Sequence, residues 1–201
     1  MKRFGTAIIL AGGKSTRMGF DKQFLKIDER RLMDSIVHKL KEEFEEIIIV
    51  TNKPDYYIGL SHIITYDLIR DIGPLAGIHA GLKLSSSQYA FVVACDMPNI
   101  NMDYVRYMKS VIADRDFHGC VTEFGDWIEP FSSFFSREIV GNIEEHIKTN
   151  HRSINSLLKN LSIHYIGESK AREFSPNWDM FLNLNTREDL NNYLVDLENT
   201  R

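Results

Sequence analysis

Several features that would indicate other classes of protein are missing from this sequence. Only two cysteines occur in 201 residues, Cys95 and Cys120, and they lie far apart without forming a CxxC pair. This spacing gives no disulfide framework, argues against a structural zinc site and fits two buried thiols in a reducing compartment. The seven histidines show no HxxxH or HxH spacing, and no GxSxG motif occurs. We therefore expect neither a histidine-bound metal nor serine-hydrolase chemistry.

Long apolar runs and an excess of positive charge are missing as well. No segment of about 20 apolar residues could span a membrane, and the first residues lack the pattern of a signal peptide. The net charge of −4 gives no broad attraction for nucleic acid or an anionic membrane. We therefore expect a cytoplasmic protein, a monomer, with small-molecule substrates and neither nucleic acid nor membrane as a partner.

Short apolar runs alternate with longer segments of helical period, which is typical of an α/β protein with a mostly parallel sheet. We predict a single domain over residues 1–201, folded as a three-layer α/β/α sandwich with a Rossmann-like sheet. The expected strands are 6–10, 47–51, 63–66, 89–94, 129–135 and 162–166. The expected helices are 32–44, 75–84, 103–112, 138–147 and 154–161. A last helix is expected to begin with a capping box formed by Thr186 and Asp189.

The most informative segment is the strand and glycine-rich turn that read IILAGGKSTRMGFDK from Ile8 to Lys22. Gly12 and Gly13 would let phosphate oxygens approach backbone N–H groups, because neither residue has a side chain in the way. Three cations follow within nine positions, namely Lys14, Arg17 and Lys22. Lys14 and Lys22 can act as point charges, and the Arg17 guanidinium can contact two phosphate oxygens at once. This turn is therefore predicted to bind a triphosphate.

Two better-known phosphate loops do not fit this turn. The Walker pattern GxxxxGK[ST] would need a glycine where Ile8 stands, and the dinucleotide pattern GxGxxG would need one at Lys14. An ordinary strand-to-helix turn would explain the two glycines alone. The three cations and the acidic residues described next favour an anion site instead.

Asp96 ends the hydrophobic run FVVACD and precedes Met97 and Pro98. This position is the carboxyl edge of an expected central strand, where ligands bind in open α/β sheets. Mg²⁺ usually takes one or two protein carboxylates and completes its shell with phosphate oxygens and water. We therefore predict that Asp96 holds Mg²⁺, although an Asp that forms a turn before Pro98 is an alternative.

Three further positions have both a functional and a structural interpretation. Asp67 ends the run HIITYD at the same expected edge and could accept hydrogen bonds from a ribose or base, or it could form a turn or cap. Asn52, after IIIVT, is equally ambiguous. Asn183 and Asn185 in FLNLNT would alternate on one face of a strand and could orient a second substrate, although turn and cap roles are common for asparagine.

Taken together, these motifs resemble those of the molybdenum cofactor guanylyltransferases. The resemblance rests on LAGGKSTRMGFDK, GPLAG at 73–77, CDMP at 95–98 and NLNT at 183–186, which occur in the expected order over nearly the whole chain. It implies a nucleotidyltransferase with a glycosyltransferase-A-like fold, of the nucleotide-diphospho-sugar transferase type. The implied reaction transfers GMP from GTP to the terminal phosphate of molybdopterin, giving the guanine dinucleotide form of the cofactor and pyrophosphate.

The resemblance also implies roles for individual residues. GTP would bind along Leu10, Ala11, Gly12 and Gly13, with Arg17 and Lys22 on the phosphates, Asp67 near the nucleoside, Asp96 on Mg²⁺, and Asn183 and Asn185 near the pterin. A phosphate nucleophile is already anionic and needs no general base, so alignment and charge neutralisation would carry the reaction.

Some residues depart from the family pattern, and other functions stay open. Glu129 precedes Pro130 where histidine or glutamine is frequent, at a position near the expected acceptor. The cytidylyltransferases that act on molybdopterin or methylerythritol phosphate resemble this chain too, but usually carry LAAG where Ala11, Gly12 and Gly13 stand. A non-catalytic nucleotide-binding protein is a third alternative. Loss of a phosphate cation or of the metal carboxylate would favour it, and this chain keeps Arg17, Lys22 and Asp96.

Overall fold

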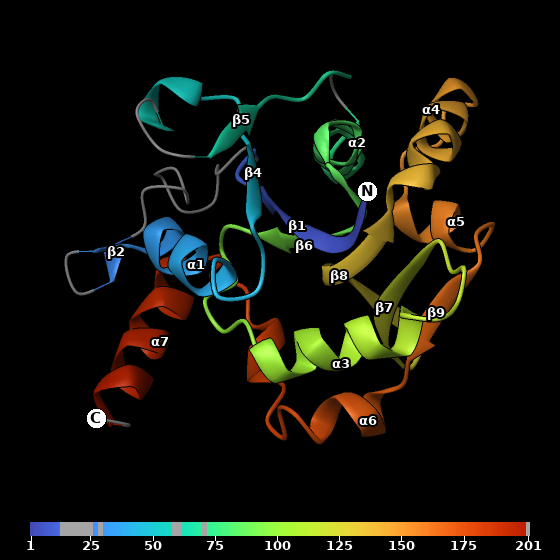
Figure 1. Cartoon of the computed structure of the whole chain (residues 1–201). Coiled ribbons are helices and arrows are strands. Elements are labelled where there is room, and N and C mark those ends of the chain that lie inside the picture. Colours follow the sequence, from blue (N-terminus) through green and yellow to red (C-terminus); the bar gives the residue numbers. More distant parts are fainter. Residues whose placement is uncertain (13–25, 28–29, 58–61, 70–71, 200–201) are drawn as a thin grey trace.

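A computed structural model describes residues 1–12, 26–27, 30–57, 62–69 and 72–199 of the chain. These residues form a seven-stranded sheet with strand order β5-β4-β1-β6-β8-β7-β9 and a separate antiparallel ribbon of two short strands, β2 and β3 (Figure 1). The strands are β1 (Lys2–Leu10), β2 (Lys26–Ile27), β3 (Arg30–Arg31), β4 (Glu46–Val50), β5 (Ile63–Thr65), β6 (Ser87–Ala94), β7 (Gly119–Phe124), β8 (Trp127–Ser136) and β9 (Ile163–Ile166).

Helices cover both faces of the sheet. The α-helices are α1 (Leu32–Leu40), α2 (Pro74–Leu84), α3 (Met102–Ile112), α4 (Val140–Lys148), α5 (Ile154–Leu158), α6 (Glu168–Arg172) and α7 (Arg187–Asn199), and short 3-10 helices are η2 (Pro54–Tyr57), η3 (Arg137–Ile139) and η4 (Asp179–Phe181). One face carries α1, α3, α6 and α7, and the other carries α2, α4 and α5 (Figure 1). The predicted three-layer α/β/α sandwich is therefore confirmed.

Most strand pairs in the sheet are parallel. β1 pairs in parallel with β4 and β6, β4 pairs with β5, and β7 pairs with β9, whereas β8 runs antiparallel to both β6 and β7. Because β1, β4, β5 and β6 share one direction, their carboxyl ends meet at the same edge of the sheet, which is where ligands bind in this architecture. The residues that follow these four ends are Gly12, Asn52, Asp67 and Asp96.

The core consists of two apolar clusters, one on each face of the sheet. The cluster under α1 and α3 includes Leu32, Ile36 and Leu40, which the helical period had placed on one face, and each is at most 2% exposed. The cluster under α2, α4 and α5 includes Ile8, Ile48 and Val92. The strands are buried on both faces because helices cover both, which explains their nearly continuous apolar runs.

Several expected elements differ from those observed. The helix expected over 32–44 ends at Leu40, the one expected over 138–147 begins as η3, and the sequence did not reveal β7 or α6. Asn183 and Asn185 do not lie on a strand, because the segment after η4 forms no ladder with a neighbouring strand. Among the described residues, no helix combines the length and apolar character needed to cross a bilayer.

Candidate functional site

The carboxyl ends of four strands are aligned by backbone hydrogen bonds that continue beyond the regular ladder. Ala11 N–H donates to Val50 O at 2.8 Å, Cys95 N–H donates to Leu10 O at 3.1 Å, and Thr51 N–H donates to Thr65 O at 2.8 Å. These bonds fix the first residue after each strand relative to its neighbours. The site is therefore built on the rigid sheet, although its functional groups lie just outside it.

Gly12, Asn52 and Asp67 meet at one end of this edge. Asn52 Nδ2 donates a long hydrogen bond of 3.5 Å to Asp67 Oδ2. A Cβ atom at Gly12 would lie 3.4 Å from Asn52 Nδ2 and 3.9 Å from Asp67 Oδ2, so a side chain there would fill the space between the turn and these polar groups. We call Gly12, Asn52 and Asp67 the nucleoside corner.

Helix α2 closes this corner from one side. Its Gly77 lies against the end of β1, and a Cβ atom there would be 2.9 Å from Leu10 Cδ2 and 3.7 Å from Asp67 Oδ1. Burial raises the pKa of the Asp67 carboxyl above its usual value, and the hydrogen bond from Asn52 partly offsets this increase. Asp67 is therefore a partly desolvated hydrogen-bond acceptor. The space beside it stays open because Gly12 and Gly77 have no side chains.

Asp96 and the segment 183–185 form a second group, which we call the metal corner. Asp96 is 8% exposed and lies two residues after the end of β6. Its backbone oxygen accepts a hydrogen bond of 2.9 Å from Leu184 N–H, which draws the segment that contains Asn183 and Asn185 to the same edge. The sequence placed these residues together only by family resemblance, and the structure brings them into contact through the backbone.

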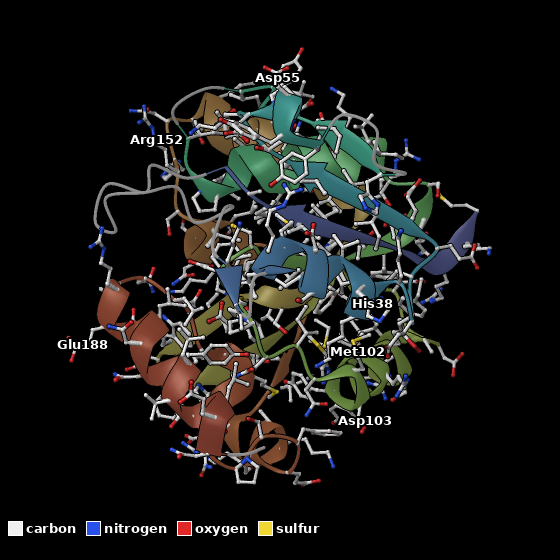
Figure 2. The ribbon with its side chains drawn as sticks, turned by 90° about the vertical axis from the view of Figure 1, so that its left-hand side faces the viewer. His38, Asp55, Met102, Asp103, Arg152 and Glu188 are labelled. Atoms are coloured by element: carbon white, nitrogen blue, oxygen red, sulfur yellow. The ribbon has the colours of Figure 1, made fainter. Side chains whose placement is uncertain are left out.

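The asparagines of this segment are held by local hydrogen bonds. Asn183 Nδ2 donates to Phe181 O at 3.0 Å, and the backbone N–H groups of Asn185 and Thr186 both donate to Asp189 Oδ2, at 2.8 and 2.7 Å. Thr186 Oγ1 accepts from Asp189 N–H at 3.1 Å, which confirms the expected capping box with Asp in place of Glu. The start of α7 thus fixes the position of Asn185; Figure 2 shows the neighbouring Glu188 at the surface.

Glu129, which departs from the family pattern near the expected acceptor, is a further functional candidate. It is 3% exposed, and burial raises the pKa of its carboxyl to about 7. The hydrogen bond from Phe131 N–H, 3.0 Å long, opposes this increase, and the negative charge of Asp96 adds to it. The Glu-Pro pair was visible in the sequence, and the antiparallel pairing of β8 with β6 places the start of β8 toward the edge of the sheet where β6 ends.

The donor groups of the metal corner fit a hard divalent cation. Asp96 offers a carboxylate at this edge, and Asn183 and Asn185 carry amide oxygens in the adjoining segment that Leu184 N–H joins to Asp96. Within the described ranges, no three His, Cys, Asp or Glu side chains are grouped as a ready-made metal cage. A sparse set of oxygen ligands suits Mg²⁺, which retains water and takes phosphate oxygens from its substrate, better than it suits Zn²⁺.

The predicted phosphate loop lies outside the described residues. Gly13, Lys14, Arg17 and Lys22 all fall in the range 13–25, so the structure gives no geometry for these positions. Leu10, Ala11 and Gly12 lead into that range at the nucleoside corner. The predicted roles of Gly13, Arg17 and Lys22 stay predictions from the sequence.

Residues 7–165 match the family described as the MobA-like NTP transferase domain. The chain belongs to the MobA-like NTP transferase family. A molybdenum cofactor guanylyltransferase of Syntrophotalea carbinolica is 51% identical over 187 residues, which cover 93% of this chain and 89% of that protein. A probable molybdenum cofactor guanylyltransferase of Peptoclostridium acidaminophilum is 50% identical over 197 residues, with coverage of 96% and 89%.

A solved structure supports the fold independently. The crystal structure of molybdopterin-guanine dinucleotide biosynthesis protein A from Archaeoglobus fulgidus superimposes with a TM-score of 0.82, covering 96% of this chain and 99% of that one at 23% identity. This likeness confirms the nucleotidyltransferase fold of the MobA-like family for this chain. As a member of that family, the protein is an enzyme of the nucleotidyltransferase class.

Proposed function

We propose that this protein transfers GMP from GTP to the terminal phosphate of molybdopterin, forming molybdopterin guanine dinucleotide and releasing pyrophosphate. Two relatives that are 51% and 50% identical to this chain support this choice of substrates. One is named molybdenum cofactor guanylyltransferase, and the other is named probable molybdenum cofactor guanylyltransferase. The second glycine of LAGG, Gly13, favours guanine over the cytidylyl branches, which usually carry LAAG.

The observation that carries the proposal is the arrangement of two polar corners along one sheet edge. The nucleoside corner follows β1, β4 and β5, and the metal corner follows β6, which is the next strand beside β1. A nucleotide that extends from the first corner would direct its phosphates toward Asp96. The acceptor would then approach from the side of Asn183 and Asn185.

In this proposal each residue has a defined task. Asn52 and Asp67 would orient the nucleoside, with Gly12 leaving room for it, and the turn from Leu10 to Gly13 would offer its backbone N–H groups. Arg17 and Lys22 would neutralise phosphate oxygens. Asp96 would hold Mg²⁺, which supplies positive charge to the α-phosphate and the leaving pyrophosphate when it is bound.

No described residue needs to act as a general base. The attacking group is a phosphate oxygen that is already ionised near neutral pH, so proton abstraction is unnecessary. Asn183 and Asn185 would align this oxygen with the α-phosphorus, opposite the leaving pyrophosphate. Alignment of this kind lowers the barrier because the enzyme has already restricted the motion of both reactants.

The proposal is tested by single-turnover transfer from α-labelled GTP, CTP, ATP and UTP, each with Mg²⁺ and molybdopterin. We expect labelled dinucleotide from GTP only, with one pyrophosphate released for each transfer. Preferential use of CTP would replace the guanylyl assignment with the cytidylyl one. Binding of GTP without any transfer would favour a nucleotide-binding protein that lacks catalysis.

Asp96→Ala provides the control for the metal. We expect this variant to lose Mg²⁺-dependent transfer while it keeps the circular dichroism spectrum of the native protein, since the residue lies after β6 and outside the sheet ladder. A rate within a few-fold of the unchanged protein would exclude Asp96 as the metal ligand.

A further inference from the structure

Strands β7 and β8 continue as a hairpin after β8 has left β6. The ladder between β6 and β8 ends with Val92 opposite Ser133. The ladder between β7 and β8 runs on to Phe124 opposite Trp127. Because β8 is antiparallel to β6, the tip of this hairpin lies toward the edge of the sheet at which β6 ends, which is the edge that carries the candidate site.

The tip of the hairpin carries two aromatic side chains on one face. Phe124 and Trp127 are directly opposite each other, and opposite residues of an antiparallel pair have their side chains on the same face. Both are exposed, at 40% and 48%. Gly125, the first residue of the two-residue turn between them, has a φ of 56°, a left-handed value that such turns require. A tight turn therefore fixes the two aromatic residues relative to each other.

Phe124 connects the hairpin to the segment that leads into the metal corner. The Phe124 ring lies 5.3 Å from the Trp178 ring, and the Trp178 ring lies 4.8 Å from the Phe181 ring, between centroids. The Arg172 guanidinium lies 6.0 Å from the Phe124 ring and 4.9 Å from the Trp178 ring. Phe181 O accepts the hydrogen bond from Asn183 Nδ2. A continuous set of contacts thus joins the hairpin to the metal corner.

Trp127 is the aromatic residue of this pair that has no partner ring. Within the described part of the chain its indole packs on no other aromatic ring, and its Nε1–H donates no hydrogen bond. Trp127 belongs to β8, which lies between β7 and β6 in the sheet, so it stands on the side of the hairpin toward the end of β6. A half-exposed indole on a fixed hairpin offers a flat apolar surface to a planar ligand.

The order of the strands indicates which substrate this surface fits. The nucleoside corner follows β1, β4 and β5, which lie on one side of β6, whereas β8 and β7 lie on the other side. A nucleotide that extends from the nucleoside corner to Asp96 therefore leaves the hairpin to the acceptor. The pterin of molybdopterin contains a planar pyrimidine ring, which can stack on an indole as nucleobases stack on aromatic side chains.

We propose that Trp127 binds the acceptor by stacking its indole on the pterin ring of molybdopterin, on the side of Asp96 away from the nucleoside corner. This inference rests on the proposed function, which supplies the identity of the acceptor. It predicts that Trp127 acts on the affinity for molybdopterin, whereas GTP binds without its help.

The test is the dissociation constant of molybdopterin, measured by ultrafiltration with the full chain in the absence of oxygen. We expect Trp127→Ala to raise this constant at least about fivefold, the lower end of the loss when an aromatic side chain that stacks on a base is removed. Trp127→Phe keeps an aromatic ring and should raise it less. The matched control Leu84→Ala removes a similarly exposed apolar side chain, 45% exposed, from the far end of α2, and should change it less than about twofold. The KM for GTP should be equal in all four proteins.

Tryptophan fluorescence provides a second measurement that does not depend on the folding of Trp127→Ala. Pterins absorb light at the wavelengths that tryptophan emits, so a stacked pterin quenches the indole. Molybdopterin should quench the unchanged protein strongly, and Trp127→Phe, which keeps only Trp178, should lose most of this quenching. Equal quenching in these two proteins would overturn the inference, and so would an increase smaller than about fivefold in the dissociation constant of a folded Trp127→Ala.

The assay of nucleotide transfer distinguishes failure of the inference from failure of the proposed function. If GMP is transferred and molybdopterin binds equally well to Trp127→Ala, only the inference is wrong. If the unchanged protein does not bind molybdopterin, the acceptor assignment fails and the inference fails with it. Binding of molybdopterin that depends on Trp127, in a protein that transfers no GMP, would support the inference and overturn the function.

Discussion

At the scale of single residues, the site depends on small differences in side-chain size and charge. Gly12 leaves open the space beside Asn52 and Asp67, and Gly77 allows α2 to approach the end of β1. Asp96 and Glu129 are both buried, and Asp96 is joined by its backbone oxygen to the segment with two asparagines. At this edge the small residues leave space for a ligand and the acidic residues supply charge. The packed strands behind the edge hold these residues in place.

Lys22 tests the predicted phosphate loop at this scale. Loss of a fixed positive charge next to the negative charge that develops on the phosphates should cost about 2–4 kcal/mol in transition-state stabilisation. We therefore expect Lys22→Ala to lower kcat/KM for GTP by a factor of roughly 30 to 1,000. The control is Lys26→Ala, because Lys26 is exposed on β2 and has the same charge. Equal rates for the two variants would remove Lys22 from the site.

Glu129 predicts a pH dependence of stability in the metal-free protein. Its pKa is raised from an ordinary 4.5 to about 7, so the folded protein binds more protons than the unfolded chain between these values. This group contributes at most about 3 kcal/mol to the free energy of unfolding. The contribution is fully present below the unfolded pKa and is lost as the pH rises through about 7.

Urea unfolding in EDTA at several pH values between 5 and 8 measures this effect. Glu129→Gln lacks the titrating group, so its free energy of unfolding should fall less across this range than that of the unchanged protein. The shifted carboxyl of Asp67 is present in both proteins and cancels in the comparison. Identical pH profiles would show that Glu129 titrates normally in the folded state.

At the scale of elements, helical period predicted which faces are buried, but ladder partners were harder to foresee. Leu32, Ile36 and Leu40 were placed correctly on the buried face of α1. The asparagine segment looked like a strand because polar and apolar residues alternate there. This segment forms no ladder with a described strand, and Leu184 N–H donates a hydrogen bond to Asp96 O at the sheet edge. Alternation alone therefore could not distinguish a strand from an extended segment.

Helix α2 packs closely against β1 at Gly81. A Cβ atom at Gly81 would lie 2.6 Å from Cγ2, 2.8 Å from Cδ1 and 3.0 Å from Cγ1 of Ile8, which is fully buried in β1. Alanine has a higher helix propensity than glycine by about 1 kcal/mol. Overpacking at a buried contact costs about 1–3 kcal/mol, and the crowding of three Ile8 atoms should outweigh the gain.

We therefore expect Gly81→Ala to destabilise the protein in urea unfolding. Gly141→Ala is the matched control, because Gly141 lies on exposed α4 and a Cβ atom there would meet no atom within 4 Å. This control should gain about 0.4–1 kcal/mol. A stabilising effect of Gly81→Ala would mean that β1 and α2 separate easily, which would contradict the tight packing beside the nucleoside corner.

At the scale of the whole molecule, one sheet joins the two apolar clusters. β1, β4 and β6 contribute residues to both clusters, because their side chains alternate between the two faces. Loss of the sheet would expose both clusters at once. We therefore propose that the chain unfolds as a single domain, in agreement with the boundaries expected from its length.

Urea unfolding with two probes tests this expectation. The two tryptophans, Trp127 and Trp178, lie in the C-terminal half and report on it by fluorescence, whereas far-ultraviolet circular dichroism reports on helices throughout the chain. A single cooperative unit requires the two transitions to coincide. Separate midpoints would show that the N-terminal part, with α1 and α2, unfolds independently of the part that carries β7 to β9.

The sequence by itself determined the class of fold and the family, and it supplied most of the residues proposed for the site. Local patterns carry this information: apolar runs indicate buried strands, a period of 3.6 residues indicates helices, and Gly12, Asp67 and Asp96 come two residues after strands. Asp67 and Asp96 were found in this way, because each one ends a strand-like run.

Only the tertiary structure decided which of these residues face one another. The hydrogen bond of Asn52 with Asp67 and the bond from Leu184 to Asp96 join residues 15 and 88 positions apart, and the pairing of Glu129 with Thr122 results from strand register. Register is set by long-range ladders and by an irregularity in β8 that leaves no periodic signal in the sequence. For this reason the burial of Glu129 and its hydrogen bond from Phe131 N–H could not be predicted from the sequence.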